Sequence, residues 1–304
     1  MNGGSIYLIK ENQRKNYNMG FFIAMLSALS TTAKDVVSKT ISTAVHPDVS
    51  TCASFLFALP YYAIIILIAY SLGYEDFIFS GWFLALVGLR SITDVCAEGC
   101  KMRAFTHGDI SLVTAFLSLS PLILAVISPL ITGDSVTLLD ALGLTLIVIG
   151  SLLLLRKDSQ TGEIFQLKAI AYACASSFAF ALNHCFDRLA VSESSPLLAG
   201  FAVTLSAGLF TLPFALRHKT FCHNLAANQR PLWLRGAFET TQLFSKLVAM
   251  SLLEAHIVVG LLRLSLLSTV ISGRLFFGES LATSRFIPSL IIYVGIVVLL
   301  WGNL

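Results

Sequence analysis

The stretch LRSITDVCAEGCKMRA, residues 89–104, places five charged side chains directly after the apolar run GWFLALVG, residues 81–88. An α-helix turns by about 100° per residue, so Arg90, Asp94 and Lys101 would lie within about 40° of one another on one face. A charged residue at the centre of a bilayer costs about 2.5–3.5 kcal/mol. The stretch therefore predicts either a polar loop or a membrane helix whose charged face is turned away from lipid.

The composition favours a membrane helix. Of 304 residues, 56% are hydrophobic and only 12% are charged, and the mean hydropathy is +0.81. Soluble domains carry about 25% charged residues. We therefore predict an integral membrane protein that contacts the lipid bilayer. The net charge of +3 is small and spread over short segments, so we expect no nucleic-acid partner.

Ten apolar segments are long enough to cross a bilayer, which takes about 20 mostly apolar residues in a helix. Lipid leaves unpaired backbone groups without partners, and the segments lack strict apolar–polar alternation, so we expect helices. The predicted spans are approximately residues 20–40, 50–73, 80–103, 110–132, 136–155, 167–188, 196–216, 231–252, 256–277 and 284–302.

The chain also contains an internal repeat. The stretch LRGAFETTQLFSKLVA, residues 234–249, matches residues 89–104 at an offset of 145 residues. Five helices per half require the second half to enter the membrane from the opposite side. Inverted repeats with a site between them are typical of transporters, and a purely structural duplication is the alternative. The repeat pairs Arg90 with Arg235, Asp94 with Glu239, and Lys101 with Lys246.

We therefore predict an all-α membrane protein with ten transmembrane helices, arranged as two inverted five-helix repeats. Four segments are expected along the chain. They are a polar, flexible N-terminal segment at 1–18, the first repeat at 19–156, a linker at 157–166 and the second repeat at 167–304.

Two interpretations fit the charged stripe and its copy. In the first, the arginines and carboxylates form ion pairs four residues apart and the lysines extend from the helix ends towards water. In the second, the stripes face each other across a central cavity that binds a polar solute. We favour the cavity for Arg90 and Asp94, which lie near the middle of their helix, whereas Lys101 lies near a helix end.

Other polar residues lie at membrane depth. Lys34 and Asp35 lie in the first predicted helix, Asn183 and His184 in the sixth, and Arg263 in the ninth. The repeat aligns Lys34 with Asn183 and Asp35 with His184. Each of them taken alone is more typical of a structural hydrogen bond. Together with the six residues of the two stripes, these five are the candidate substrate-binding residues.

Prolines and glycines indicate where helices bend or pack closely. Pro121 and Pro129 can bend the fourth predicted helix, because proline removes a backbone donor. The small residues Gly143, Gly150 and Gly295 are expected to permit close helix packing.

Cysteine and histidine patterns do not indicate a metal or catalytic site. The six cysteines lie mostly in apolar segments and are expected to be buried, without a disulfide framework. Cys96 and Cys100 are one helical turn apart, but no second ligand pair accompanies them. The sequence shows no nucleophile–base pair and no paired histidines. We therefore expect no metal, no cofactor and no enzymatic activity.

The five-plus-five pattern resembles the drug/metabolite transporter superfamily, EamA-type branch. In that pattern the third helix of each half ends in an alanine-rich step and a polar turn follows. Ser-Pro lies in the fourth helix, a Gly-Glu turn comes next, and the fifth helix has a glycine near its end. Asp134 replaces the usual Glu, and Leu266 replaces a proline in the ninth helix. The matching residues are Ala104, Ser120-Pro121, Gly133-Asp134 and Gly150 in the first half, and Ala249, Ser265, Gly278-Glu279 and Gly295 in the second.

The resemblance implies transport by alternating access through a central site, with both termini in the cytoplasm. That orientation conflicts with the positive-inside rule, because most loop lysines and arginines would then lie outside. Labelling of the loop at 217–230 distinguishes the two orientations. We expect the bacterial inner (plasma) membrane as the location, and a monomer or homodimer.

The predicted function is secondary transport of a small-molecule substrate that is polar and amphoteric, such as an amino acid or a cofactor-like molecule of the S-adenosylmethionine kind. Opposite charges on the third and eighth helices suggest this substrate class. Proton coupling is expected through Asp94, Glu98 or Glu239. The alternatives are a channel or a non-transporting membrane sensor and, least favoured, an intramembrane enzyme.

Overall fold

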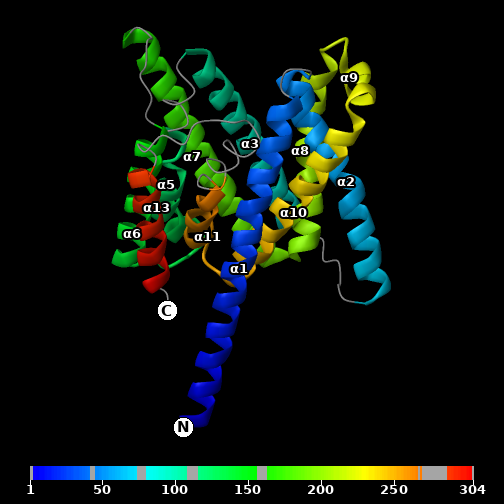
Figure 1. Ribbon diagram of the computed structural model, residues 1–304. Helices are drawn as coiled ribbons and strands as arrows, with labels where there is room; N and C mark the ends of the chain where they lie inside the picture. Colours follow the sequence, from blue (N-terminus) through cyan, green and yellow to red (C-terminus); the bar gives the residue numbers. More distant parts are fainter. Residues whose placement is uncertain are drawn as a thin grey trace.

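The computed structural model describes residues 3–41, 45–73, 80–107, 116–155, 163–265, 268 and 286–302. Within these ranges the chain forms α-helices and no strand, which confirms the all-α class (Figure 1). The helices are α1 (Gly3–Ile41), α2 (Pro47–Ser71), α3 (Gly81–His107), α5 (Ser120–Ile131), α6 (Leu138–Leu155), α7 (Glu163–Glu193), α8 (Pro196–Leu216), α9 (Phe221–Ala227), α10 (Gln229–Leu252), α11 (Ala255–Leu262) and α13 (Phe286–Trp301).

Three of the described helices are both long and apolar enough to cross a membrane on their own. They are Asp48–Ser71, Leu167–Glu193 and Pro196–Leu216. The charged helices α3 and α10 are not among them. The fourth and ninth predicted spans extend into residues outside the described ranges. Of the fourth span the structure describes α5, and of the ninth it describes α11. The described residues therefore do not confirm the count of ten spans.

The outer surface of the helices is apolar. Large hydrophobic side chains are exposed on several of them, including Leu67 of α2 (68%), Leu130 of α5 (85%) and Ile287 of α13 (65%). In water such a surface would be unfavourable, whereas lipid tails accept it. This exposure fits the membrane location predicted from the composition.

Two local predictions need correction. α1 begins at Gly3, so it includes the polar segment expected to precede the first helix. Pro121 lies in the first turn of α5 and does not bend a longer helix in the described part of the chain. Proline suits a first turn because its missing N–H needs no helical partner there. Pro129 does lie inside α5.

The packing of the helices follows the repeat. α3, the third helix of the first half, packs against α7, the first helix of the second half, and α1 packs in the same way against α10. Like helices also pair with like, because α2 packs against α8 and α6 against α13. Each of these four contacts thus either has a counterpart with the two halves exchanged or pairs equivalent helices. These contacts fit two related repeats, while their inverted orientation in the membrane stays a prediction.

α6 and α13 pack with their backbones in contact. A Cβ atom added at Gly143 would lie 2.8 Å from the carbonyl oxygen of Gly295, and one added at Gly295 would lie 2.8 Å from that of Gly143. At Gly150 an added Cβ would lie 2.8 Å from the backbone of Pro288. The prediction that these three glycines permit close packing is therefore confirmed.

Candidate functional site: a charged central cavity

A cavity of about 360 Å³ lies among α1, α2, α3, α7 and α10. The side chain of Asp35 lies outside the described part of the structure, and Arg263 does not line the cavity. The other candidate residues line it: Lys34, Arg90, Asp94, Lys101, Asn183, His184, Arg235, Glu239 and Lys246. The structure therefore brings together the charged stripes of both halves. Their binding to a solute stays a prediction.

The sequence reasoning missed a buried carboxylate on one side of this cavity. Asp187 of α7 is fully buried. Its Oδ1 accepts a hydrogen bond from Nε of Arg90 at 3.3 Å, and its Oδ2 accepts one from Nζ of Lys246 at 2.7 Å. Because Arg90 lies on α3 and Lys246 on α10, Asp187 connects the two predicted stripes. His184 lies one turn earlier on the same helix, with Nδ1 3.9 Å from Oδ2 of Asp187.

Arg90 also holds a second carboxylate. Its Nη1 donates to Oδ2 of Asp94 at 3.0 Å, four residues along the same helix. The other oxygen of Asp94 accepts a hydrogen bond from the side-chain amide of Asn183 at 2.8 Å. The carbonyl oxygen of Asn183 in turn accepts one from the hydroxyl of Thr93. We name Arg90, Asp94, Asn183, Asp187 and Lys246 the Asp187 cluster.

A second set of charged contacts surrounds Glu239 of α10. Oε2 of Glu239 accepts a hydrogen bond from the hydroxyl of Ser54 at 2.8 Å and lies 3.2 Å from Nζ of Lys34. Lys34 also donates to the side-chain oxygen of Gln242 at 3.5 Å. These four residues form the Glu239 cluster. Nearby, Arg235 donates to the backbone carbonyl of Ser50 at 2.7 Å and to its hydroxyl.

The two clusters contain one equivalent contact. The repeat aligns Lys34 with Asn183 and Glu239 with Asp94. Lys34 of α1 contacts Glu239 of α10, and Asn183 of α7 contacts Asp94 of α3. The two contacts are therefore equivalent under this alignment, while the matching depth of these groups in the membrane stays a prediction.

The geometry combines the two interpretations of the stripe. Arg90 and Asp94 form the predicted ion pair and also line the cavity. Lys246 is only 4% exposed and binds Asp187, so it does not extend towards water. Nζ of Lys101 lies 5.6 Å from the centre of the Phe180 ring, at the same cavity. Ion pairing and cavity lining are therefore not alternatives here.

A signal for Asp187 was present in the sequence. It lies four residues after Asn183 and three after His184, so one helical face carries all three. Gln242, three residues after Glu239, follows the same rule. Ser54 carried no signal of this kind, because a single serine in an apolar helix is common.

A separate polar contact joins the halves where α5, α7 and α11 meet. Oδ2 of Asp134 accepts a hydrogen bond from the backbone N–H of Ala255 at 3.0 Å, and its Oδ1 lies 3.5 Å from Nε of Arg188. The next residue, Ser135, donates its hydroxyl to Glu254 at 2.9 Å. Asp134 thus caps the start of α11, which gives the acidic residue after Gly133 a structural role.

The cysteines are all free. Cys52 and Cys185 are buried, as predicted, whereas Cys96 and Cys222 are exposed, so that expectation was wrong for the latter two. Among the described residues, one group could hold a metal ion by the chemistry of its side chains. It consists of His46, Asp48 and His218 and lies away from the cavity.

Comparisons with known proteins identify the fold and the family. No curated protein matches the chain, whereas 29 chains of solved structures do. One of them, described only as "Crystal structure of protein", is similar with a TM-score of 0.71 and 13% sequence identity, and covers 93% of this chain and 97% of its own. At that identity the similarity shows the fold alone. The EamA-like transporter family matches residues 18–156 and 167–301. The chain belongs to the EamA-like transporter family.

Proposed function

We propose that the chain is a secondary transporter that carries a small, polar, amphoteric organic metabolite by alternating access. Membership of the EamA-like family makes it a membrane transporter. The proposal adds the substrate class, the ten-helix arrangement and the location in the bacterial inner membrane. Its site is the central cavity between the Asp187 cluster and the Glu239 cluster.

The observation that carries the proposal is the presence of both charges on opposing helices of one cavity. Arg90 and Lys246 hold Asp187, and Lys34 holds Glu239. A solute carboxylate could take the place of Asp187 beside the cations, while a solute ammonium group could take the place of Lys34 beside Glu239. Such an exchange keeps each buried charge paired, which limits the desolvation penalty.

The size and lining of the cavity support a metabolite and not a polymer. A volume of about 360 Å³ lies at the lower end of the range typical of small-molecule sites, about 300–1,000 Å³. The lining comes from helices of both halves. Inverted-repeat transporters place their substrate at such an interface, so that rocking of one half against the other opens the site to either side.

Uptake into proteoliposomes tests the substrate site. A thermal-shift screen of the purified protein against amphoteric, cationic and anionic metabolites first selects the solute. The double variant Asp94→Asn/Glu239→Gln should reduce its uptake by about tenfold or more, because a lost charge-assisted hydrogen bond is worth about 1.5–3 kcal/mol. Thr241→Ala on α10, whose exposed side chain bonds only within its own helix, is the matched control. Wild-type uptake by the double variant would overturn the proposed site.

Proton coupling is a separate part of the proposal. Asp94 and Glu239 line the cavity, whereas the side chain of Glu98 lies outside the described part of the structure. An imposed pH gradient should drive uptake above the equilibrium level in wild-type liposomes. Uptake that does not respond to the gradient, but is accelerated by substrate on the opposite side of the membrane, would show an exchanger and would contradict proton coupling.

Cys222 offers a test of orientation. It is exposed on α9, in the segment between α8 and α10. With both termini in the cytoplasm, a membrane-impermeant maleimide should label Cys222 from outside intact cells. The exposed Cys96 has to be changed to serine first, so that it does not contribute to the signal. Labelling only after the cells are opened would favour the reverse orientation.

A further inference from the structure

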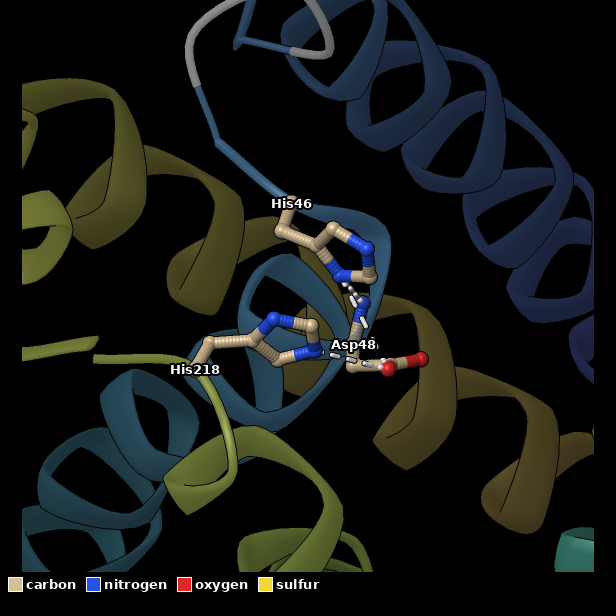
Figure 2. A group of neighbouring side chains, drawn as sticks. All are labelled: His46, Asp48 and His218. Atoms are coloured by element: carbon tan, nitrogen blue, oxygen red, sulfur yellow. Dashed lines mark hydrogen bonds and ion pairs between the residues drawn. The ribbon is translucent and has the colours of Figure 1, made fainter. Parts of the chain in front are cut away.

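Three side chains that can bind a metal ion meet at the start of α2. His46 is the N-cap of α2, Asp48 lies in its first turn, and His218 follows α8 (Figure 2). Oδ2 of Asp48 lies 3.1 Å from Nε2 of His218 and 3.7 Å from Nδ1 of His46. Figure 2 shows the two imidazole rings side by side, with the Asp48 carboxylate beside the His218 ring. The ring centres are 3.8 Å apart.

The donor atoms suit a divalent transition metal. Two imidazole nitrogens and one carboxylate oxygen form a common protein ligand set for zinc-class ions. In such sites a water molecule takes the fourth coordination position. One donor atom from each residue lies within 4.8 Å of the other two. Bonds of about 2.0–2.2 Å place two ligands of one ion up to about 4 Å apart. Asp48 and His218 already meet this limit, whereas the His46 ring, whose centre lies 3.8 Å from that of His218 at an interplanar angle of 30°, must turn so that its lone pair points to the same ion.

Water can reach this group. The side chains of His46 and Asp48 are 48% and 45% exposed, and that of His218 is 29% exposed. A metal ion could therefore enter from solution and retain a bound water. The group also spans the repeat, because α2 belongs to the first half and His218 to the second. α2 and α8 also pack against each other.

We propose that His46, Asp48 and His218 form a binding site for a divalent transition-metal ion of the zinc class. Without metal, His218 hydrogen-bonds to Asp48 and Nδ1 of His46 accepts the backbone N–H of Asp48. When metal binds, both imidazole lone pairs and the carboxylate turn to the ion. The ion then links the start of α2 to the segment after α8, outside the central cavity and independent of its substrate.

Zinc titration of the full chain tests the proposal. Purified protein is treated with a chelator, desalted and titrated with Zn²⁺ by calorimetry. One equivalent should bind, and His46→Ala and His218→Ala should each weaken that binding by at least tenfold. His223→Ala is the matched control, because His223 is an exposed histidine of the neighbouring α9. The absence of saturable binding to the wild type, or equal binding by the His46 and His218 variants, would overturn the site.

Two further measurements keep the result interpretable. The metal-free unfolding temperature of each variant, together with His218→Gln as a milder change, separates a lost ligand from a misfolded protein. Cobalt(II) replaces zinc and reports its ligands by absorption. Bands without thiolate charge transfer are expected here. A thiolate band that disappears in Cys96→Ser/Cys100→Ser would place the metal at those cysteines and overturn the proposal.

Discussion

The two halves make one contact in the same place with different chemistry. Asn183 of α7 donates an amide N–H to Asp94 of α3, whereas Lys34 of α1 places an ammonium group beside Glu239 of α10. The first pair carries a net negative charge and the second none. The repeat has therefore kept the geometry of the contact and changed its charge. Asp94 is also paired with Arg90. Under the proposed function, a solute between the halves would therefore meet an amide at one of these contacts and an ammonium group at the other.

The largest effect is expected where both halves depend on one group. Asp187→Asn leaves Arg90 and Lys246 buried without their shared carboxylate, which should lower the free energy of unfolding by about 3–5 kcal/mol. Unfolding of the purified protein by SDS titration in mixed micelles measures this. Adding Lys246→Met to the variant should recover part of the loss. A variant as stable as the wild type would contradict the assigned pairing.

The second-largest effect is expected at the contact between Lys34 and Glu239, which differs in charge from its counterpart in the other half. Lys34→Ala removes the ammonium group from Glu239 and should cost about 1.5–3 kcal/mol, because a buried charge loses a charged partner. Lys34→Asn copies the first half and should cost less, since an amide can donate to Glu239 as Asn183 does to Asp94. The same SDS titration compares them. Equal losses in both variants would mean that the halves are not interchangeable at this position.

Where the halves are alike, equal effects are expected. Gly143→Ala and Gly295→Ala both insert a methyl group into the same helix crossing and should each cost about 1–3 kcal/mol. Gly88→Ala on α3 is the control, because no atom lies within 4 Å of its added Cβ. It should be neutral or slightly stabilising, given the helix propensity of alanine. If the control lost as much free energy of unfolding as Gly143→Ala, the loss could not be attributed to the close contact between α6 and α13.

The smallest effect is expected at the contact where α5, α7 and α11 meet. Arg188→Ala should change the free energy of unfolding by less than about 1 kcal/mol, because its side chain is 27% exposed. Asp134→Ala should cost more, about 1 kcal/mol, since it also removes the cap from Ala255. Both variants are compared in the same denaturant series. The reverse order would show that the ion pair, and not the cap, holds this end together.

Much of the fold could be predicted because hydropathy and internal repetition can both be observed directly in the sequence. The offset of 145 residues alone aligns Asp94 with Glu239, and the helical period places Arg90 beside Asp94. These two rules select six of the nine candidate side chains that line the cavity, and the remaining three, Lys34, Asn183 and His184, come from the alignment of the first helices of the two halves. Helix starts were less predictable: the backbone continues helically to Gly3 although the side chains there are polar.

The partners within the site could not be predicted in the same way. Asp187 pairs with residues 97 and 59 positions away, and nothing in a single helix specifies such contacts. The metal-binding group has the same origin, since His218 meets Asp48 across 170 residues. Contacts of this kind follow from how helices cross, which a hydropathy pattern leaves undetermined.

The crossing of α6 and α13 has a consequence for movement. Side chains normally separate the backbones of two packed helices, but here the two backbones are in direct contact. The fifth helices of the two halves, α6 and α13, therefore cannot slide along each other without a steric clash between their backbones. Under the proposed alternating access, spin labels on α6 and α13 should therefore keep their separation during the transport cycle.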